Sequence, residues 1–475
     1  MDASTLDTLM KAAEINDPAA LFNLGLMYSL GKGVPKDKVK AAEYYEKAAL
    51  LGNVKAQFNL GLMYSKGDGV PIDKKRSSEL YQLAANQGNA NAQTNLARMY
   101  MKGDGIPVDT EKALELYEKA AAQNHSDAQL NLGLMYDQGD IIPVNKKRAF
   151  ELYNKSAANG NEKAQFNLGI MYQQGEKGVI EKDIKKAVEL YTAASEKGVS
   201  RAQFNLGVIY SKGENGIPKD IEKAAQLFQK AADQGDPEAQ LNLGAMYAKG
   251  EGVIQDISKA FELYKKAAEQ DNAKAAFNLA VMYSKGEGVK RDQREAVKYY
   301  QKAADHNIYQ AYFNLGTLYY KGAEGVPINK EKAAQLYEKA VNLKPNYPKC
   351  LFNLAVMYEK GDGVPVNQEK SIQFYERAAA LDYPAALLNL ATFYAEGSFG
   401  VAKDSKKAFN YFKRSADLGN AKAQFNVGIM YEKGNGCESD LQKAKEYFEK
   451  SANQGFQEAQ QKLQELRFIP QTRNK

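Results

Sequence analysis

The chain has 475 residues with 64 Lys and Arg against 58 Asp and Glu, a formal net charge of +6. These charges are interspersed, which argues against a basic nucleic-acid-binding tail, and the only cysteines, Cys350 and Cys437, are too far apart to suggest a disulfide framework or a metal site. No apolar run reaches the ~18 residues that a membrane span needs. The start, Met1 to Thr5, lacks the basic and apolar segments of a signal peptide. We therefore expect a cytoplasmic protein without a membrane span.

One motif recurs along the whole chain, and an asparagine heads it every time. An apolar residue and then Gly or Ala follow the asparagine, and a Tyr comes five residues after it. A repeat period of 36 to 39 residues indicates a stacked repeat protein. The twelve asparagines are Asn23, Asn59, Asn95, Asn131, Asn167, Asn205, Asn242, Asn278, Asn314, Asn353, Asn389 and Asn426.

The predicted elements run in chain order from a leading helix to a closing one. Residues 4–14 match the second helix of a repeat, and twelve pairs of helices, A and B, follow over about 17–455. Residues 456–467 match a last helix A in which Lys462 replaces the asparagine, and 468–475 are expected to form a flexible tail. Because the units of a stacked repeat contact only their neighbours, residues 1–467 are predicted to be one elongated solenoid.

Helix A of the second repeat carries two apolar stripes. Ala56, Leu60 and Tyr64 are spaced by four residues on one face, and Phe58 and Leu62 lie on another. A helix that is apolar on two faces packs between other helices. The Gly or Ala after Asn-Leu allows a neighbouring backbone to come close.

Helix B of the same repeat starts at Asp73, which suits a helix N-cap, and it ends at Gly88, which suits the left-handed conformation after a helix. An aromatic residue, here Tyr81, follows the cap by eight positions. We expect the Tyr and Phe positions of both helices to be core. The cap position is Asp or Asn in every repeat: Asp37, Asp73, Asp109, Asn145, Asp183, Asp220, Asp256, Asp292, Asn329, Asn367, Asp404 and Asp440.

The segment Ala-Gln-Phe-Asn-Leu-Gly-Leu-Met-Tyr-Ser-Lys-Gly-Asp-Gly-Val-Pro, with the Asp73 cap, Ala84-Ala85 and Gly88 after it, resembles the Sel1-like repeat. The resemblance covers nearly all of residues 1–467. It implies an all-α fold, a right-handed superhelical solenoid of antiparallel helical hairpins related to tetratricopeptide repeats. It also implies an adaptor in larger assemblies, with no single ligand.

A polar strip on helix A is the candidate binding site. At about 100° per residue, the positions four before the asparagine, the asparagine itself and seven after it lie within about 40° of one direction. An Asn amide can pair with both the N–H and the C=O of an extended peptide, and the cations beside it favour acidic segments. The candidate residues are Asn59, Asn167, Asn205, Asn242, Asn278, Asn314, Asn353, Asn426, Lys55, Lys66, Arg201, Lys212, Lys274, Lys285, Lys349, Lys360, Lys422 and Lys433.

Two interpretations of the asparagines stay open. If the A helices line a concave surface, as the resemblance suggests, the amides face a ligand. Alternatively, each amide bonds across the stack of A helices to a neighbouring carbonyl and is part of the architecture. A separate line of cations, three residues after each helix B cap, is expected to pair with the cap carboxylates rather than to bind anions: Lys40, Arg76, Lys112, Arg148, Lys186, Lys223, Lys259, Lys332, Lys370, Lys407 and Lys443, interrupted by Glu295.

The sequence favours a non-enzymatic scaffold that docks an extended, acidic partner segment along the A helices. The only histidines, His125 and His306, lie apart from any nucleophile or metal-like cluster, and the Gly-rich turns follow helices rather than strands. We therefore expect no catalytic residue, metal or cofactor. Binding of single-stranded RNA or another polyanion is the alternative, although one asparagine repeated twelve times cannot read a varied base sequence. The oligomeric state is not predicted.

Overall fold

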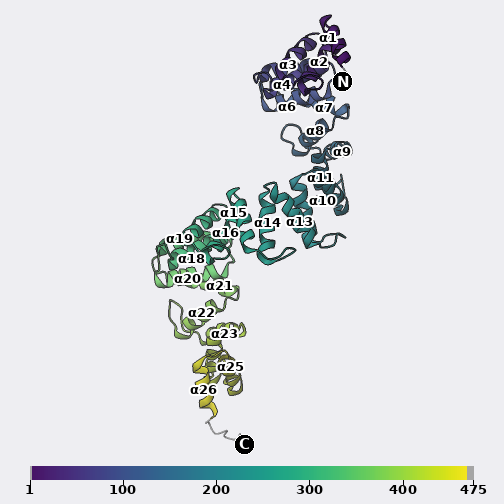
Figure 1. Cartoon of the computed structure of the whole chain (residues 1–475). Coiled ribbons are helices and arrows are strands. Elements are labelled where there is room, and N and C mark those ends of the chain that lie inside the picture. The colour runs from purple at the N-terminus through teal and green to yellow at the C-terminus, as the bar shows by residue number, and fades with distance from the viewer. Residues whose placement is uncertain (1–2, 468–475) are drawn as a thin grey trace. The chain divides into compact units, whose positions relative to one another are not determined.

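The computed structural model describes residues 3–467, and these form 26 α-helices in chain order (Figure 1). The predicted all-α fold of repeated helical hairpins is confirmed. The A helices are α2 (Pro18–Leu30), α4 (Val54–Lys66), α6 (Ala90–Lys102), α8 (Ser126–Gln138), α10 (Glu162–Gln174), α12 (Ser200–Lys212), α14 (Pro237–Lys249), α16 (Ala273–Lys285), α18 (Tyr309–Lys321), α20 (Pro348–Lys360), α22 (Pro384–Glu396), α24 (Ala421–Lys433) and α26 (Gln457–Arg467). The B helices are α1 (Ala3–Glu14), α3 (Lys38–Leu50), α5 (Lys74–Asn86), α7 (Thr110–Ala122), α9 (Lys146–Ala158), α11 (Ile184–Glu196), α13 (Ile221–Asp233), α15 (Ile257–Glu269), α17 (Gln293–Asp305), α19 (Lys330–Leu343), α21 (Gln368–Ala380), α23 (Ser405–Asp417) and α25 (Leu441–Asn453).

The helices belong to two compact units, one ending at Asp236 and the other beginning at Pro237. Within each unit an A helix packs against the B helix that follows it and against the B helix before it, wherever that helix is part of the same unit, so that contacts join sequence neighbours. That residues 1–467 make a single solenoid stays a prediction. The predicted flexible tail, 468–475, lies outside the described residues.

Helix boundaries follow the predicted capping residues. The Asp73 carboxylate accepts a hydrogen bond from the backbone N–H of Arg76 at 2.8 Å, and the equivalent Asp or Asn caps helix B in the other eleven repeats. Helix α4 ends at Gly67, whose φ of 73° is left-handed. Because Gly has no Cβ, it adopts this conformation without strain and closes the helix.

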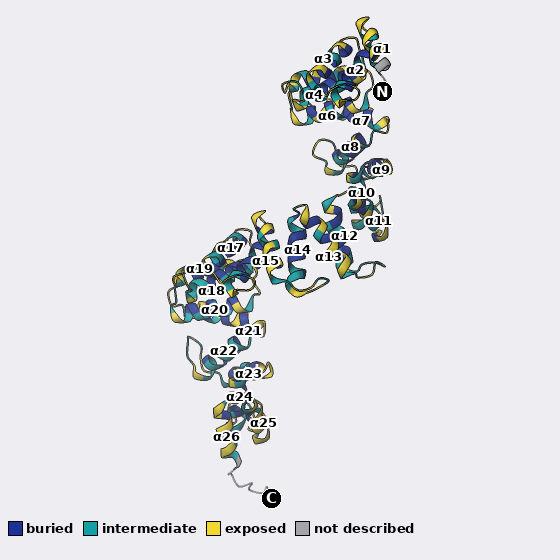
Figure 2. Cartoon of the chain, in the orientation of Figure 1, coloured by how far each residue is buried: buried dark blue, intermediate teal, exposed yellow. Residues whose placement is uncertain are grey.

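In the eight hairpins with Gly after Asn-Leu or Asn-Val, an aromatic ring of helix B lies against this small residue of helix A in the core. Buried and exposed residues alternate along the helices (Figure 2). A Cβ added to Gly61 would come within 2.8 Å of the Tyr81 ring, and one added to Gly207 within 2.7 Å of the Phe228 ring. Both rings are 2% exposed. The predicted role of this small residue, which is to let the partner helix approach closely, is therefore realised through a flat ring.

The prediction that all the Tyr and Phe positions are core was wrong for the tyrosines of helix A. Tyr64 and Tyr210 are half-buried, and among the equivalent helix A tyrosines only Tyr358 is buried. The period that placed them on an apolar stripe does not distinguish a fully covered position from one at the edge of the stripe. Their exposed edges meet lysines of helix B, as described below.

A buried glutamine links successive repeats in a way that the sequence analysis missed. Gln93 donates to the backbone carbonyl of Ala85 at 3.1 Å, and its own carbonyl oxygen accepts from Gln123 of the next B helix end at 2.8 Å. The same pair of contacts recurs at Gln57 and Gln424. The sequence does contain a signal for this contact, because a glutamine stands two residues before the asparagine in most repeats.

The close approach of ring and glycine generates a stability prediction. We expect Gly207→Leu to lower the free energy of unfolding by ~1–3 kcal/mol or more, because the new side chain overlaps the Phe228 ring in a filled core. The control is Val208→Leu, a small volume change at a half-buried position of the same helix. Urea unfolding followed by circular dichroism measures both, and equal midpoints for the two variants would contradict the packing described here.

Candidate functional site on the A helices

The structure places all eighteen candidate residues on A helices of the two units. Every candidate asparagine is half-buried, whereas every candidate lysine and the arginine are exposed. This difference matches the helix wheel, which puts the asparagine between the cations on one side of the helix. Each strip segment is therefore a partly sheltered amide with solvated cations before and after it.

The asparagine amides pair with tyrosine hydroxyls of the preceding B helix. Asn389 donates to the Tyr375 hydroxyl at 2.9 Å, and Asn314 donates to the Tyr300 hydroxyl at 3.2 Å. Asn59 makes a third such bond, to the Tyr45 hydroxyl at 3.3 Å. In five further repeats the asparagine lowers the pKa of the corresponding tyrosine, as a hydrogen-bonding neighbour of the hydroxyl does: Asn95, Asn167, Asn205, Asn278 and Asn353.

Burial and hydrogen bonding shift the pKa of these tyrosine hydroxyls. Burial raises the pKa of Tyr264 to about 12, and the hydrogen bond from Asn278 lowers it in part. The pKa of Tyr375 is raised by burial first and then by its hydrogen bond to Glu359. The hydroxyls therefore stay protonated at neutral pH, and each can accept from the amide while it donates elsewhere, as Tyr375 does to Glu359 at 2.5 Å.

The pairing consumes only part of each amide. An Asn side chain has two N–H donors and a carbonyl oxygen with two lone pairs, and the tyrosine hydroxyl takes one donor. In Asn389 and Asn314 the contact to the hydroxyl is made by the nitrogen. The amide is thus held in one orientation by the fold and retains hydrogen-bonding capacity for a further partner.

Four repeats depart from the tyrosine pairing. Asn131 and Asn242 instead donate to the carbonyl four residues earlier in their own helix, each at 2.7 Å. The preceding B helices of Asn242 and Asn426 carry Phe228 and Phe412, which have no hydroxyl. Asn23 follows the leading helix, where Leu9 occupies the aromatic position. The predicted architectural contact, to a carbonyl of a neighbouring A helix, is not the one that the amides make in the eight paired repeats.

The cations of the strip are mostly solvated. Arg201 lies 3.4 Å from the buried carboxylate of Asp236, and Lys285 lies 3.3 Å from Glu287. The structure shows no other ion pair within 4 Å for the candidate lysines among the residues that it describes, and their side chains are exposed. Most of this positive charge is available to a partner.

The strip is hollowed between α18 and α20. A cleft of about 310 Å³ is lined there by Asn314 and Asn353, with Phe313, Thr317 and Val356 beside them. Tyr337 of the intervening B helix also lines it and is 1% exposed. A cleft of this volume is at the small end of the range for sites that hold a ligand group, about 300–1,000 Å³.

The line of cations on helix B is engaged within the fold. In nine repeats the lysine ammonium lies over the helix A tyrosine ring of its own repeat, for example Lys223 over Tyr210 at 4.1 Å. The predicted pairing with the cap carboxylate is found in some repeats, such as Lys112 with Asp109 at 2.9 Å. The tyrosine face is thus the commoner partner of this line.

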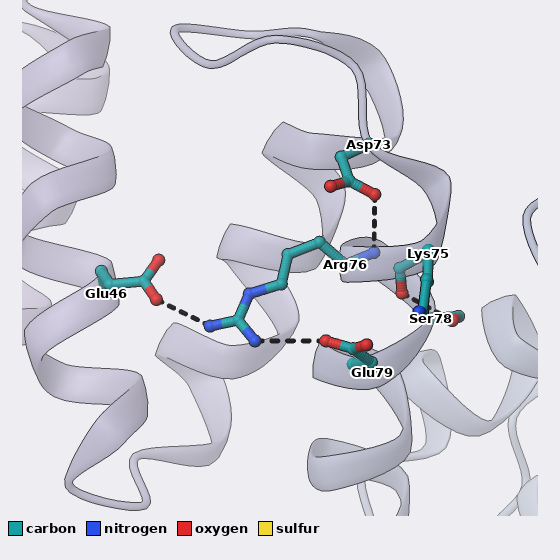
Figure 3. A network of polar contacts seen from close by, with 6 residues as sticks. All are labelled: Glu46, Asp73, Lys75, Arg76, Ser78 and Glu79. Carbon is teal, nitrogen blue, oxygen red and sulfur yellow. Dashed lines mark hydrogen bonds and ion pairs between the residues drawn. The ribbon is translucent and has the colours of Figure 1, made fainter.

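Arg76 belongs to the helix B line of cations, and its side chain forms ion pairs that connect two repeats (Figure 3). Its guanidinium contacts Glu46 of the preceding B helix at 2.8 Å and Glu79 one turn further along its own helix at 3.2 Å. The pKa of Arg76 is raised by these two carboxylates. Because these cations are already paired within the fold, the helix B line is not assigned an anion-binding role.

The fold and this pattern of contacts define an α-solenoid of short helical hairpins. The Sel1 repeat model matches twelve consecutive segments of the chain, and the chain belongs to the Sel1 repeat family. The matched residues are 18–53, 54–89, 90–125, 126–161, 162–199, 200–236, 237–272, 273–308, 310–344, 348–383, 384–420 and 421–456. Members of this family are commonly protein–protein interaction scaffolds.

Solved structures extend the comparison. The chain is similar to a protective antigen of uropathogenic Escherichia coli that displays an SLR fold, with 29% identity, a TM-score of 0.79 and coverage of 99% of this chain and 98% of that one. It is also similar to a Sel1 repeat protein of Oxalobacter formigenes, with 27% identity, a TM-score of 0.48 and coverage of 70% and 93%. No curated protein sequence matches the chain.

Residues 3–467 contain no group of three or more His, Cys, Asp or Glu placed to hold a metal ion. None of their helices combines the length and apolar character that crossing a membrane requires.

The tyrosine–asparagine pairing predicts unequal costs for the same substitution. Asn389→Ala removes a bond to the Tyr375 hydroxyl, whereas Asn426→Ala faces Phe412 and has no such bond to lose. We expect Asn389→Ala to cost ~1 kcal/mol more in the free energy of unfolding. Chemical denaturation of the two variants measures this. In a double-mutant cycle, Tyr375→Phe should cost less in the Asn389→Ala background than in the wild type by about the value of the shared bond, while the bond from Tyr375 to Glu359 is lost in both backgrounds and cancels. Equal costs for Asn389→Ala and Asn426→Ala would refute the structural role of the pairing.

Proposed function

We propose that the protein is a non-enzymatic scaffold that docks an extended, acidic segment of a partner protein along its A helices. The observation that carries the proposal is the repeated half-buried amide, fixed by a tyrosine hydroxyl and flanked by exposed cations. Membership of the Sel1 repeat family supports the general role of a scaffold. The acidic, extended character of the partner is inferred from the amides and cations of the strip.

The amides suit a peptide backbone. Each fixed Asn offers a donor and an acceptor at one place, which is the pair of groups that a peptide unit needs. Packed helices lie about 8–10 Å apart, and an extended chain rises about 3.3 Å per residue. A strand-like segment would therefore meet one amide every two or three residues, and its side chains would decide specificity.

The cations suit acidic side chains. In α20 and α24 the asparagine is preceded and followed by exposed lysines, Lys349 and Lys360 in the first and Lys422 and Lys433 in the second. Opposite charges across an interface increase the association rate and penalise partners of the wrong sign. The proposal includes a cytoplasmic location, which the two free cysteines favour.

The experiment uses a random peptide library selected against the full chain. We expect acidic, unstructured sequences to be enriched. The variant Lys274→Glu/Lys349→Glu/Lys360→Glu should bind the selected peptide at least about tenfold more weakly, because three attractive contacts become repulsive. The matched control is Lys266→Glu/Lys413→Glu/Lys445→Glu, which changes the net charge equally at exposed positions of B helices. Fluorescence anisotropy with a labelled selected peptide measures the affinities.

The outcomes separate the alternatives. Enrichment of basic or neutral peptides, or an equal loss of affinity in both triple variants, would contradict the strip as an acidic docking surface. A single-stranded RNA dodecamer is measured in parallel at 50 and 200 mM salt. Tight RNA binding that falls steeply with salt would favour the polyanion alternative, since phosphate contacts release counterions.

A further inference from the structure

The A helices around the cleft begin with residues that do not cap them. Asn or another polar residue caps most A helices, as Asn272 caps α16 by accepting from the N–H of Ala275 at 3.0 Å. At α18, α20 and α22 the cap positions hold Ile308, Tyr347 and Tyr383, and none makes a side-chain cap bond. Losing such a bond destabilises a helix. Val199 at α12 lacks a cap bond as well, but α18, α20 and α22 are three successive A helices whose cap residues are large and apolar.

These cap residues join an aromatic row beside the cleft. The rings of Phe313 and Tyr347 have their centroids 5.0 Å apart, Tyr309 and Tyr347 5.2 Å, and Phe352 and Tyr383 5.3 Å. All five of these rings are half-buried. Phe313 and Phe352 belong both to this row and to the cleft lining. The strip therefore changes character at α18 and α20, where apolar surface is added to the amides.

The charges around the cleft are unbalanced toward positive. Lys321 lines the cleft and is exposed. The neighbouring carboxylate, Asp362, is neutralised by Lys330 at 2.6 Å and accepts from the Tyr320 hydroxyl at 2.8 Å. Its pKa is lowered by these two partners, Lys330 first. Asp362 thus stays ionised and paired, which leaves the charge of Lys321 for a ligand.

We propose that this cleft is the anchor site of the docked segment: it receives one bulky apolar side chain, and an acidic residue next to that side chain in the partner faces Lys321. The inference rests on the proposed function and adds a sequence requirement to it. Asn314 and Asn353, one on each wall, bind the backbone on the two sides of the anchor. An aromatic anchor supplies a large contact area from one side chain, which is how a few residues dominate binding at interfaces.

The test compares two labelled synthetic peptides that differ at one position. Both are acidic dodecamers of Glu, Asp, Ser and Gly, and one has a single central Phe where the other has Ala. We expect the full chain to bind the Phe peptide roughly tenfold more tightly, because burial of a large apolar side chain contributes an effect of that order. Val356→Phe fills the cleft and should abolish this preference. Val281→Phe, the same position on α16, should retain it.

A second variant covers the case in which Val356→Phe does not fold. Lys321→Glu changes an exposed residue, and it should weaken binding of the Phe peptide more than Lys266→Glu does. Thermal melting of each variant checks folding. Equal affinities of the two peptides for the wild-type chain would overturn the anchor site and leave the acidic docking strip intact. Failure of both peptides to bind would count against the strip and the anchor together.

Two further outcomes overturn the anchor specifically. The preference for Phe could survive in a folded Val356→Phe variant, which would place the apolar contact elsewhere. Alternatively, free N-acetylphenylalanine amide could displace the Phe peptide at a concentration close to the peptide's own dissociation constant. In that case the cleft would be a small-molecule pocket rather than part of a peptide groove.

Discussion

The contact between the helix B ring and the small residue of helix A is the constraint on which the other contacts depend. In all eight repeats with Gly at this position, a Cβ would come within 3 Å of the ring. The ring therefore lies flat against the helix A backbone, and its far end projects beyond its own hairpin. In repeats such as those of Tyr300 and Tyr375, the hydroxyl at that end meets the asparagine of the next repeat. One side chain thus packs the hairpin internally and sets the position of its neighbour.

Polar bonds repeat with the same period as the core and fix the register between hairpins. Gln93 bonds both the preceding B helix and the end of the following one, and Lys74 contacts Asp104 of the next repeat at 3.0 Å. Buried amides that lose their partners are costly, so a misplaced repeat would leave several such groups unpaired at once. In the repeats from α16 to α22 the glutamine position holds Ala276, Tyr312, Leu351 and Leu387 instead. There the packing is apolar, and this is also where the cleft and the aromatic row occur.

Much of the architecture could be predicted from local signals. Asp73 and its equivalents are cap residues whatever surrounds them, because the bond from side chain to backbone closes within three residues. The spacing of the apolar residues likewise predicted that A and B helices alternate. The burial of Tyr64 and its equivalents was predicted wrongly, since spacing locates a stripe but not its edge. The tyrosine–asparagine pairing was not predicted, because it joins residues fourteen apart on different helices and depends on how these helices cross.

The sequence by itself determined the repeat, its caps, its small and aromatic positions, and the position of the amide and cations on one side of helix A. Those features follow from helical periodicity and from short-range bonding, which need no knowledge of neighbours. Only the tertiary structure decided that a tyrosine hydroxyl holds the amide, that the helix B lysines lie over tyrosine rings, and that a cleft opens between α18 and α20. Each of these depends on the distance between two helices, which a pattern along one helix does not contain.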